Sequence, residues 1–280
     1  MSSDLAAQVV AQLMHELESD KLVLPSLPEV ALKIRDAIED PEVDSGKIAK
    51  VISTDAALTA RLIQVANSPL VRGNRSVEGL EMAVTRMGNN MVRNVANSLI
   101  VQQMFQPTTE LSDKKFRAFW EHSTQVAAIS HALAGFARLK PDVALLAGLI
   151  HDIGALPVIK HAEDNEALLN NEDVLDEVIR KVHCIIGKEM LQRWDFPAEI
   201  VQVAELHEDI HRSGEAKADY VDIVIAANLQ SYMGSEHRLG QVDFASVPAF
   251  AKLGLNTEVS IVDLDGQGDS IREVQQALCA

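Results

Sequence analysis

Several segments of this chain place a histidine or another polar side chain on an otherwise apolar helical face. A helix advances about 100° per residue, so residues three or four positions apart share a face. His122, for example, shares a face with Phe119 and Val126, and His183 shares one with Ile179 and Ile186. The polar residues that face apolar stripes in this way are His122, the adjacent pair His151 and Asp152, His183, His207 and Asn228.

These side chains predict a metal site. A buried polar group without a partner costs about 1–3 kcal/mol, and imidazoles paired only with one another cannot satisfy the whole set. A divalent cation or an extended polar network can do so. Imidazoles with a carboxylate suit iron, manganese, zinc or nickel better than calcium, and such an ion activates water for phosphoester hydrolysis.

The remaining histidines show no such pattern. Two lie on helical patterns: His15 faces a mainly polar surface, and His131 lies roughly opposite His122 on its helix. Three are expected in polar loops, namely His161, His211 and His237. We therefore expect none of these five at the site.

Helical patterns must position the candidate residues, because no alternating strand pattern competes with them. The ranges predicted for the second half are 113–139, 142–153, 172–192, 197–208 and 219–233, followed by an irregular tail from about 237. Shorter patterns precede them, around 5–17, 29–40, 48–52, 58–66, 80–87 and 91–104. The fold class is predicted to be all-α.

The segment "QPTTELSDKK", 106–115, is polar, contains a proline and is the most convincing linker. Ser112 is predicted as the N-cap of the helix that follows, and Ser26, with Glu29, as the capping box of a helix that has Pro28 in its first turn. The linker divides the chain into an N-terminal helical bundle, residues 1–108, and a second helical domain, residues 109–280.

Composition limits the function classes. The 280 residues carry a formal net charge of −16, which disfavours general binding to nucleic acid or anionic membranes. No apolar run approaches the roughly 20 residues of a membrane span, and the N-terminus resembles no signal peptide. Cys184 and Cys279 are too few for a disulfide framework or a cysteine-rich zinc site. We expect a cytoplasmic protein.

The residues of the candidate site resemble the H…HD…D pattern of the HD superfamily of metal-dependent phosphohydrolases. The chain is more similar still to its HDOD branch, the HD-related output domain. The segments that carry this resemblance are "LPSLPEVALKI" (24–34), "ISTDAALTARLIQVANSP" (52–69), "AVTRMGNNMVRNV" (83–95), "FWEHSTQVA" (119–127), "AGLIHDIGALPV" (147–158) and "HCIIGKEMLQRWDFP" (183–197). They cover about residues 20–235.

The resemblance implies an HD-type helical fold for the second domain and a metal site. Its first metal histidine falls on His122, and its namesake pair falls on His151 and Asp152. The additional histidines of two-metal HD-GYP relatives fall on His183 and His207. The metal-ligand aspartate that ends the pattern falls on Asn228, which supplies an oxygen but no negative charge.

Other departures also weaken the expectation of catalysis. The lysine that follows "HDIG" in HD-GYP enzymes is Ala155 here, and their paired histidines correspond to Leu206 and His207. The segment "HEDIHRSGEA" lacks the GYP signature. The resemblance to HDOD proteins implies a bacterial signalling module. We therefore expect the partner to be another signalling protein or a small ligand. The sequence does not fix the oligomeric state.

Three functional interpretations remain open. The favoured one is a regulatory module with an HD-type fold that retains a divalent transition metal (iron, manganese, zinc or nickel) but little or no hydrolase activity. The second is an active phosphohydrolase of phosphomonoesters, nucleotides or cyclic dinucleotides, in which Asp152 acts as the orienting carboxylate or base. The third is a metal-free polar network that fixes how the helices pack.

Overall fold

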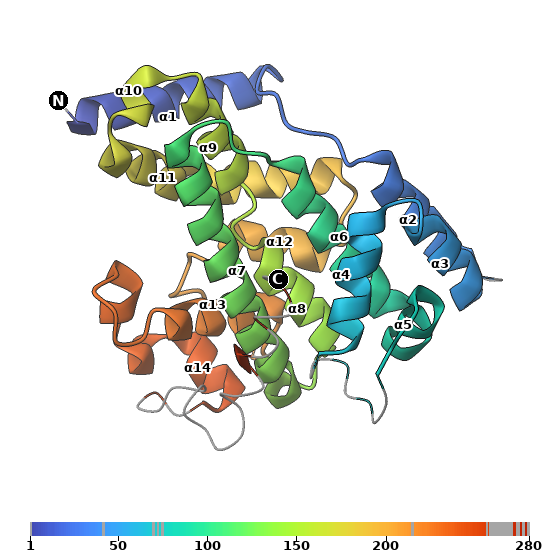
Figure 1. The fold of residues 1–280 in the computed structure, drawn as a ribbon. Helices are drawn as coiled ribbons and strands as arrows, with labels where there is room; N and C mark the ends of the chain where they lie inside the picture. The colour runs from blue at the N-terminus through green and yellow to red at the C-terminus, as the bar shows by residue number, and fades with distance from the viewer. Residues whose placement is uncertain are drawn as a thin grey trace.

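Helices make up every long regular element that the computed structural model of this chain contains in its described residues. Those residues are 2–40, 43–68, 71, 73, 76–213, 216–255, 257, 271, 272, 275 and 278. The predicted all-α class is confirmed over this part of the chain. Figure 1 shows the helices packed around α7 and α8, with α2 to α5 at one side and α13 and α14 at another.

The first half contributes six helices that are mostly short. They are α1 (Ser2–Glu18), α2 (Glu29–Glu39), α3 (Ser45–Ile52), α4 (Ala56–Ala66), α5 (Leu80–Met87) and α6 (Asn89–Met104). Aspartates cap two of them, because Asp44 accepts from the backbone N–H of Lys47 and Asp55 from that of Leu58. Gly88, at φ 74°, separates α5 from α6 in a conformation that favours glycine.

The second half contains the longest helices. They are α7 (Glu110–Ala137), α8 (Pro141–Ile150), α9 (Ala155–Glu163), α10 (Glu166–Leu169), α11 (Glu172–Arg193), α12 (Ala198–Leu206), α13 (Tyr220–Ser231) and α14 (Pro248–Leu253), with short 3-10 turns at Arg238–Gln241 and Phe244–Ser246. The tail expected to be irregular from about 237 includes α14 and the two 3-10 turns, and residues 258–270 of it lie outside the described residues.

Two predicted N-caps were wrong. Thr109, not Ser112, caps α7, and Ser112 takes the third helical position of a capping box with it. Pro28 occupies the cap position of α2, without a side-chain hydrogen bond, and helix α2 begins at Glu29 rather than just after Ser26. Before α7 the sequence offers Thr108, Thr109 and Ser112 as cap residues, and the pattern alone does not choose among them.

The predicted helix 142–153 ends early, at Ile150, and a turn at 151–154 leads into α9, which the sequence pattern did not predict. Glycine permits this turn to lie against α11. A Cβ atom on Gly154 would come within 2.0 Å of the His183 carbonyl oxygen. The turn that carries His151 and Asp152 is thereby held against the helix that carries His183.

A second close approach brings α8 onto α7. A Cβ atom on Gly148 would lie 2.8 Å from the Cα atom of Ala127, so only glycine fits between the two helices. The buried face of α8 includes Leu145, Leu149 and Ile150. These contacts fix the distance between His122, on α7, and the end of α8.

The two halves share one hydrophobic cluster that includes buried residues from α1 to α14. Helix α1 lies against α11 and not with the other N-terminal helices, as Figure 1 shows. The guanidinium of Arg193 pairs with Asp20 at 2.6 Å just beyond α1. The proposed domain boundary at 108/109 stays a prediction, and the chain's first helix is associated in space with its second half.

One stretch, Pro141–Glu163, is long and apolar enough by composition to cross a membrane, whereas no such run was expected. The turn at 151–154 interrupts it, and 83% of its most apolar window is buried inside the protein. This is the pattern of a core segment.

Candidate metal centre

Each candidate residue lies within a helix of the second half of the chain or just after the end of one. His122 lies within α7 and His183 within α11. His151 and His207 occupy the C-terminal cap positions of α8 and α12, and Asp152 follows in the turn. The ends of helices therefore supply three of the five groups. The predicted helix 142–153 extended past the true end of α8 and so still included His151 and Asp152.

The carboxylate of Asp152 is the centre of the cluster. One oxygen, Oδ1, lies 2.9 Å from His207 Nε2 and 3.3 Å from His183 Nε2. The other, Oδ2, lies 3.3 Å from His151 Nε2 and 3.8 Å from His122 Nε2. Four histidines from four segments of the sequence thus meet at one carboxylate.

The backbone fixes the orientation of three of these rings. The Nδ1 atom of His151 lies 2.7 Å from the Gly148 carbonyl oxygen, and His183 and His207 make the same contact with the carbonyls of Ile179 and Val203. A carbonyl only accepts, so each Nδ1 carries the proton and donates it. Each Nε2 then presents a lone pair toward Asp152, as metal-ligating histidines do.

This arrangement fits a cation. The Nε2 atoms of His183 and His207 lie 3.2 Å apart, and two lone pairs at that distance repel each other. His151 Nε2 and Asn228 Oδ1 are buried and have no hydrogen-bond partner within the described residues. One divalent ion or two would satisfy these acceptors together. Without an ion, one imidazole must take a second proton.

The donor atoms form two groups, each held within 4.8 Å. His122, His151 and Asp152 make one, and His183, His207 and Cys184 make the other. Asp152 lies between them because its two oxygens face different groups. The sequence analysis missed Cys184, whose sulfur lies 3.4 Å from His183 Nε2. The neighbour of a histidine on a helix usually points 100° away, so spacing gave no signal for it.

The pKa values of His122 and Asp152 are both lowered, for different reasons. Burial, followed by the proximity of His151, lowers the pKa of His122 to about 3. Burial opposes ionisation of Asp152, but His151, His183 and His207 hold its pKa well below the usual range. Asp152 is therefore a carboxylate, and His122 is a neutral imidazole able to act as a ligand.

A cleft of about 770 Å³ leads from solvent to the centre. Asp152 keeps 23% of its side chain exposed there, while the side chains of His151 and His207 are fully buried behind it. Asn228, only 4% exposed, also lines the cleft. Three cations line the same cleft, Lys115, Arg180 and Arg238, together with the carboxylates of Asp176, Glu177, Glu208 and Glu236.

Two of the three histidines expected in polar loops away from the site depart from that expectation. His161 is helical, and His237, although exposed in a loop as expected, lines the cleft. His237 stacks on Tyr232 with ring centroids 3.8 Å apart, and Tyr232 stacks in turn on His122 at 4.9 Å. His237 therefore belongs to the wall of the cleft. His161 lies in the last turn of α9, with a buried Nε2. Tyr232 is the C-terminal cap of α13. It lies four residues after Asn228 and inside the predicted helix 219–233, so helical periodicity was a signal that could have found it.

The model of the HDOD domain family matches residues 24–210. This chain belongs to the HDOD domain family. It is 30% identical to a protein of Shewanella amazonensis SB2B that is provisionally named a metal-dependent phosphohydrolase. The two structures superpose with a TM-score of 0.87 over 98% of this chain and 99% of the other.

Two further relatives are more distant. An HDOD protein of unknown function from Geobacter sulfurreducens has a TM-score of 0.68 at 23% identity, over 97% and 98% of the two chains, and so shares the fold. An uncharacterised protein of Treponema pallidum (strain Nichols) is 28% identical over 74% of this chain. The present chain spans only 42% of that protein's length.

Membership of the HDOD family and the convergence at Asp152 together suggest a metal site in this chain. The role of each ligand stays a prediction. The structure brings His122, His151, Asp152, His183 and His207 together and places Asn228 in the same cleft. None of the six predicted residues points away from the centre into bulk solvent on another face.

Proposed function

We propose that this HDOD chain is a regulatory, signal-transducing module that binds a divalent transition metal and has little or no phosphohydrolase activity. The observation that carries the proposal is the set of lone pairs that meet at Asp152, with His151 Nε2 and Asn228 Oδ1 buried and unpartnered. His122, His151, Asp152, His183 and His207 would hold the ion, with Asn228 as an oxygen ligand. The ion supplies Lewis acidity and positive charge.

Two substitutions support a reduced activity. Asn228 contributes no negative charge where the HD pattern has an aspartate, and Ala155 lines the cleft where HD-GYP relatives have a lysine. Fewer charges remain to bind the ion and to neutralise a phosphate. The module would instead bind a ligand or partner and signal to it whether the metal centre holds an ion.

A second candidate is an active phosphohydrolase, and one cation of the cleft favours it. Lys115, Arg180 and Arg238 line the cleft, although Lys115 pairs with Asp176 at 2.5 Å and Arg238 with Glu208. Arg180 is exposed and makes no ion pair among the described residues, so it is available to a phosphate. In this reading Asp152 orients the attacking water or takes its proton. The provisional name of the Shewanella relative points the same way.

One experiment separates these candidates. Untagged protein is loaded in turn with Mn²⁺, Fe²⁺, Zn²⁺ and Ni²⁺, and the bound metal is measured. Each form is then screened against phosphomonoesters, cyclic nucleotides and cyclic dinucleotides. We expect bound metal but no turnover above that of a His151→Ala, Asp152→Ala double variant.

Other outcomes would overturn the proposal. Metal-dependent turnover that disappears in the double variant would establish the phosphohydrolase. Failure to bind any of the four metals would leave a polar network in the core as the role of the cluster. Each metal is also screened without protein, because background hydrolysis by free ions is otherwise counted as activity.

We further propose that the protein acts in the cytoplasm of a bacterium, without general binding to nucleic acid or membranes. The net charge of −16 and the burial of the apolar stretch 141–163 support this. Its partner would be another signalling protein or a small ligand.

A further inference from the structure

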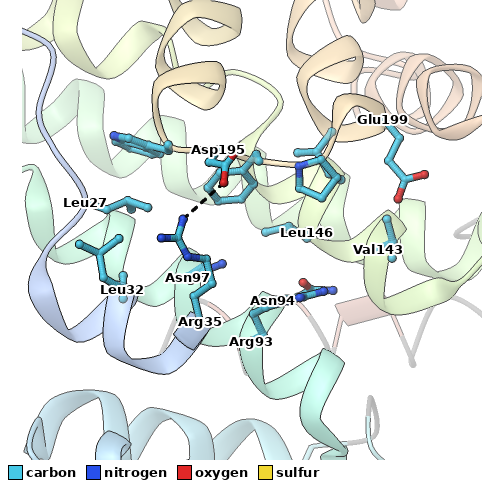
Figure 2. A pocket seen from close by; sticks show the side chains of 15 residues that line it. Leu27, Leu32, Arg35, Arg93, Asn94, Asn97, Val143, Leu146, Asp195 and Glu199 are labelled. Carbon is cyan, nitrogen blue, oxygen red and sulfur yellow. Dashed lines mark ion pairs between the residues drawn. The ribbon is translucent and has the colours of Figure 1, made fainter. Parts of the chain in front are cut away.

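A second cavity lies where the two halves of the chain meet, apart from the metal centre. Its volume is about 140 Å³. Helices α2 and α6 form one side, and α8 and the turn between α11 and α12 form the other (Figure 2). Because both halves contribute to its walls, a ligand there would contact both.

Most of the lining is apolar. Ala31 from α2, Leu146 from α8 and Ile200 from α12 are buried around it, together with the ring of Trp194. An apolar cavity of about 150 Å³ is enough to bind a benzene-sized molecule. The space therefore suits the apolar body of a small organic compound and is too small for a nucleotide.

A cation and an amide interrupt this apolar lining. Arg93 and Asn97, one turn apart on α6, line the cavity and are partly buried. Neither side chain makes a hydrogen bond or an ion pair with the residues that the structure describes. A guanidinium withdrawn from water without a partner is costly, and its paired N–H groups match a carboxylate. The cavity thus offers a binding position for an anion.

The other charges around the cavity favour a single negative charge. Arg35 faces Asp195 at 3.9 Å, and the dashed line in Figure 2 marks this ion pair. Asp195 is 93% exposed, and Glu199 stands exposed at the rim. Once Arg35 and Asp195 are paired, Arg93 is the cation of the lining that makes no ion pair with a described residue. A monoanionic carboxylate matches this one guanidinium, whereas a phosphate dianion carries a second negative charge that Asp195 and Glu199 at the rim would oppose.

We propose that this cavity binds a small organic carboxylate with an apolar body of about benzene size, whose carboxylate pairs with Arg93. The ligand would join the N-terminal helices to the second half. This site is separate from the metal centre and does not depend on the proposed function.

Trp194 provides a reporter inside the cavity wall. Its indole Nε1 donates to the Pro25 carbonyl oxygen at 2.8 Å, so the ring already links the two halves. The chain has one other tryptophan, Trp120. In a Trp120→Phe background, fluorescence therefore reports on Trp194 alone.

The test titrates phenylacetate and benzoate into the full chain and follows Trp194 emission and the melting temperature. Phenylacetamide and benzamide serve as neutral probes of nearly the same shape. We expect saturable binding of an acid at least about tenfold tighter than of its amide. Arg93→Gln should abolish this preference, and Arg93→Lys should restore part of it.

Arg117→Gln is the matched control, because Arg117 is an exposed arginine on α7 that pairs with Asp113. It should bind the acids like the parent protein. Far-UV circular dichroism of each variant without probe shows whether it is folded. Saturable binding should also be unchanged when the metal is removed, which separates this result from the metal experiment.

Three results would overturn the proposal. The first is that no probe binds saturably up to millimolar concentration. The second is that acid and amide bind equally well to the parent protein. The third is that folded Arg93→Gln keeps the preference for the acid.

Discussion

Asn228 presents a buried carbonyl oxygen at the candidate metal centre, and no donor among the described residues satisfies it. A carboxylate in that place would add a negative charge to the ligand set. We expect Asn228→Asp to tighten Mn²⁺ binding by roughly tenfold, the lower end of the effect of changing groups around a metal. Isothermal titration calorimetry measures it.

The control for this substitution is Asn90→Asp, which adds the same charge at an exposed position on α6. Its affinity for Mn²⁺ should equal that of the parent. Equal affinity in Asn228→Asp would mean that the amide does not face the ion.

Cys184 gives a spectroscopic prediction. Its sulfur lies beside His183 Nε2, and thiolate is a strong ligand for Co²⁺ and Zn²⁺. Protein loaded with Co²⁺ should therefore show a sulfur-to-cobalt charge-transfer band in the near ultraviolet. Cys184→Ser should lose the band and Cys279→Ser should keep it. A band that persists in Cys184→Ser would exclude Cys184 as a ligand.

Sequence reasoning predicted the histidine cluster because each member stands out on an apolar helical face. The same reasoning could not find Cys184, which reaches the centre from a position adjacent to His183, where the helical repeat predicts a different face. It passed over Tyr232, although this residue lies four positions after Asn228 on the predicted helix 219–233. The stacking of Tyr232 on His122 and of His237 on Tyr232 depends on tertiary packing.

Among the helices, the turn at 151–154 is the element most sensitive to substitution. Gly154→Ala would place a methyl group 2.0 Å from the His183 carbonyl oxygen, inside backbone that cannot yield. We expect a loss of stability of about 3 kcal/mol, at the upper end of overpacking costs. Urea unfolding followed by circular dichroism measures it.

Gly135→Ala is the matched control on α7, because nothing lies within 4 Å of its added Cβ atom. It should be neutral or stabilise the protein by up to about 1 kcal/mol through helix propensity. Equal stability of the two variants would mean that the turn does not press against α11.

Glu163 connects the linker, the start of α7 and the end of α9. Its carboxylate accepts from the Thr108 backbone N–H at 2.7 Å and from Ser112, and it pairs with Lys160. Burial alone would raise its pKa, but these contacts lower it from 4.5 to about 2. The folded form thus binds this proton more weakly than the unfolded chain. The resulting stability is present above about pH 4.5 and is lost as the pH falls toward 2.

Glu163→Gln should therefore destabilise the protein by about 1.5–3 kcal/mol at pH 7, the range for hydrogen bonds to a charged group. The difference from the parent should shrink between pH 4.5 and pH 2. Urea titrations at several pH values measure both. A difference that does not change with pH would mean that the charge of Glu163 is not responsible.

Element prediction succeeded where one amphipathic pattern produced one helix, as for α4, α5 and α11. It failed at the predicted helix 142–153 because the sequence there is apolar on every side and shows no period at which to stop. Contact with α11, made possible by Gly154, ends α8 and starts α9. A linear pattern does not contain that contact.

At the scale of the whole molecule, the shared hydrophobic cluster predicts cooperative unfolding. We expect one urea transition, with Trp194 fluorescence and circular dichroism changing together. Saturating Mn²⁺ at about a hundred times its dissociation constant should stabilise the protein by about 2.7 kcal/mol. Two separate transitions would mean that the halves fold independently. The metal effect should vanish in the His151→Ala, Asp152→Ala variant.

The all-α class followed from composition and periodicity, whereas the division of the chain at the linker 106–115 stays a prediction. The placement of α1 against α11 could not be predicted. An amphipathic helix shows that it covers an apolar surface, but not which surface, and the pair Arg193–Asp20 becomes evident only in three dimensions.

The carbonyl contacts of the three Nδ1 atoms have a consequence for ion exchange. Each ring is aligned by its own helix, so folding of the protein already orders the ligand atoms, and binding of the ion does not have to order them. A chelator should consequently strip the metal while leaving the helical spectrum intact, unlike the collapse seen when small zinc-dependent domains lose theirs. Reloading would then need no refolding step, which suits a centre whose occupancy changes during the life of one molecule.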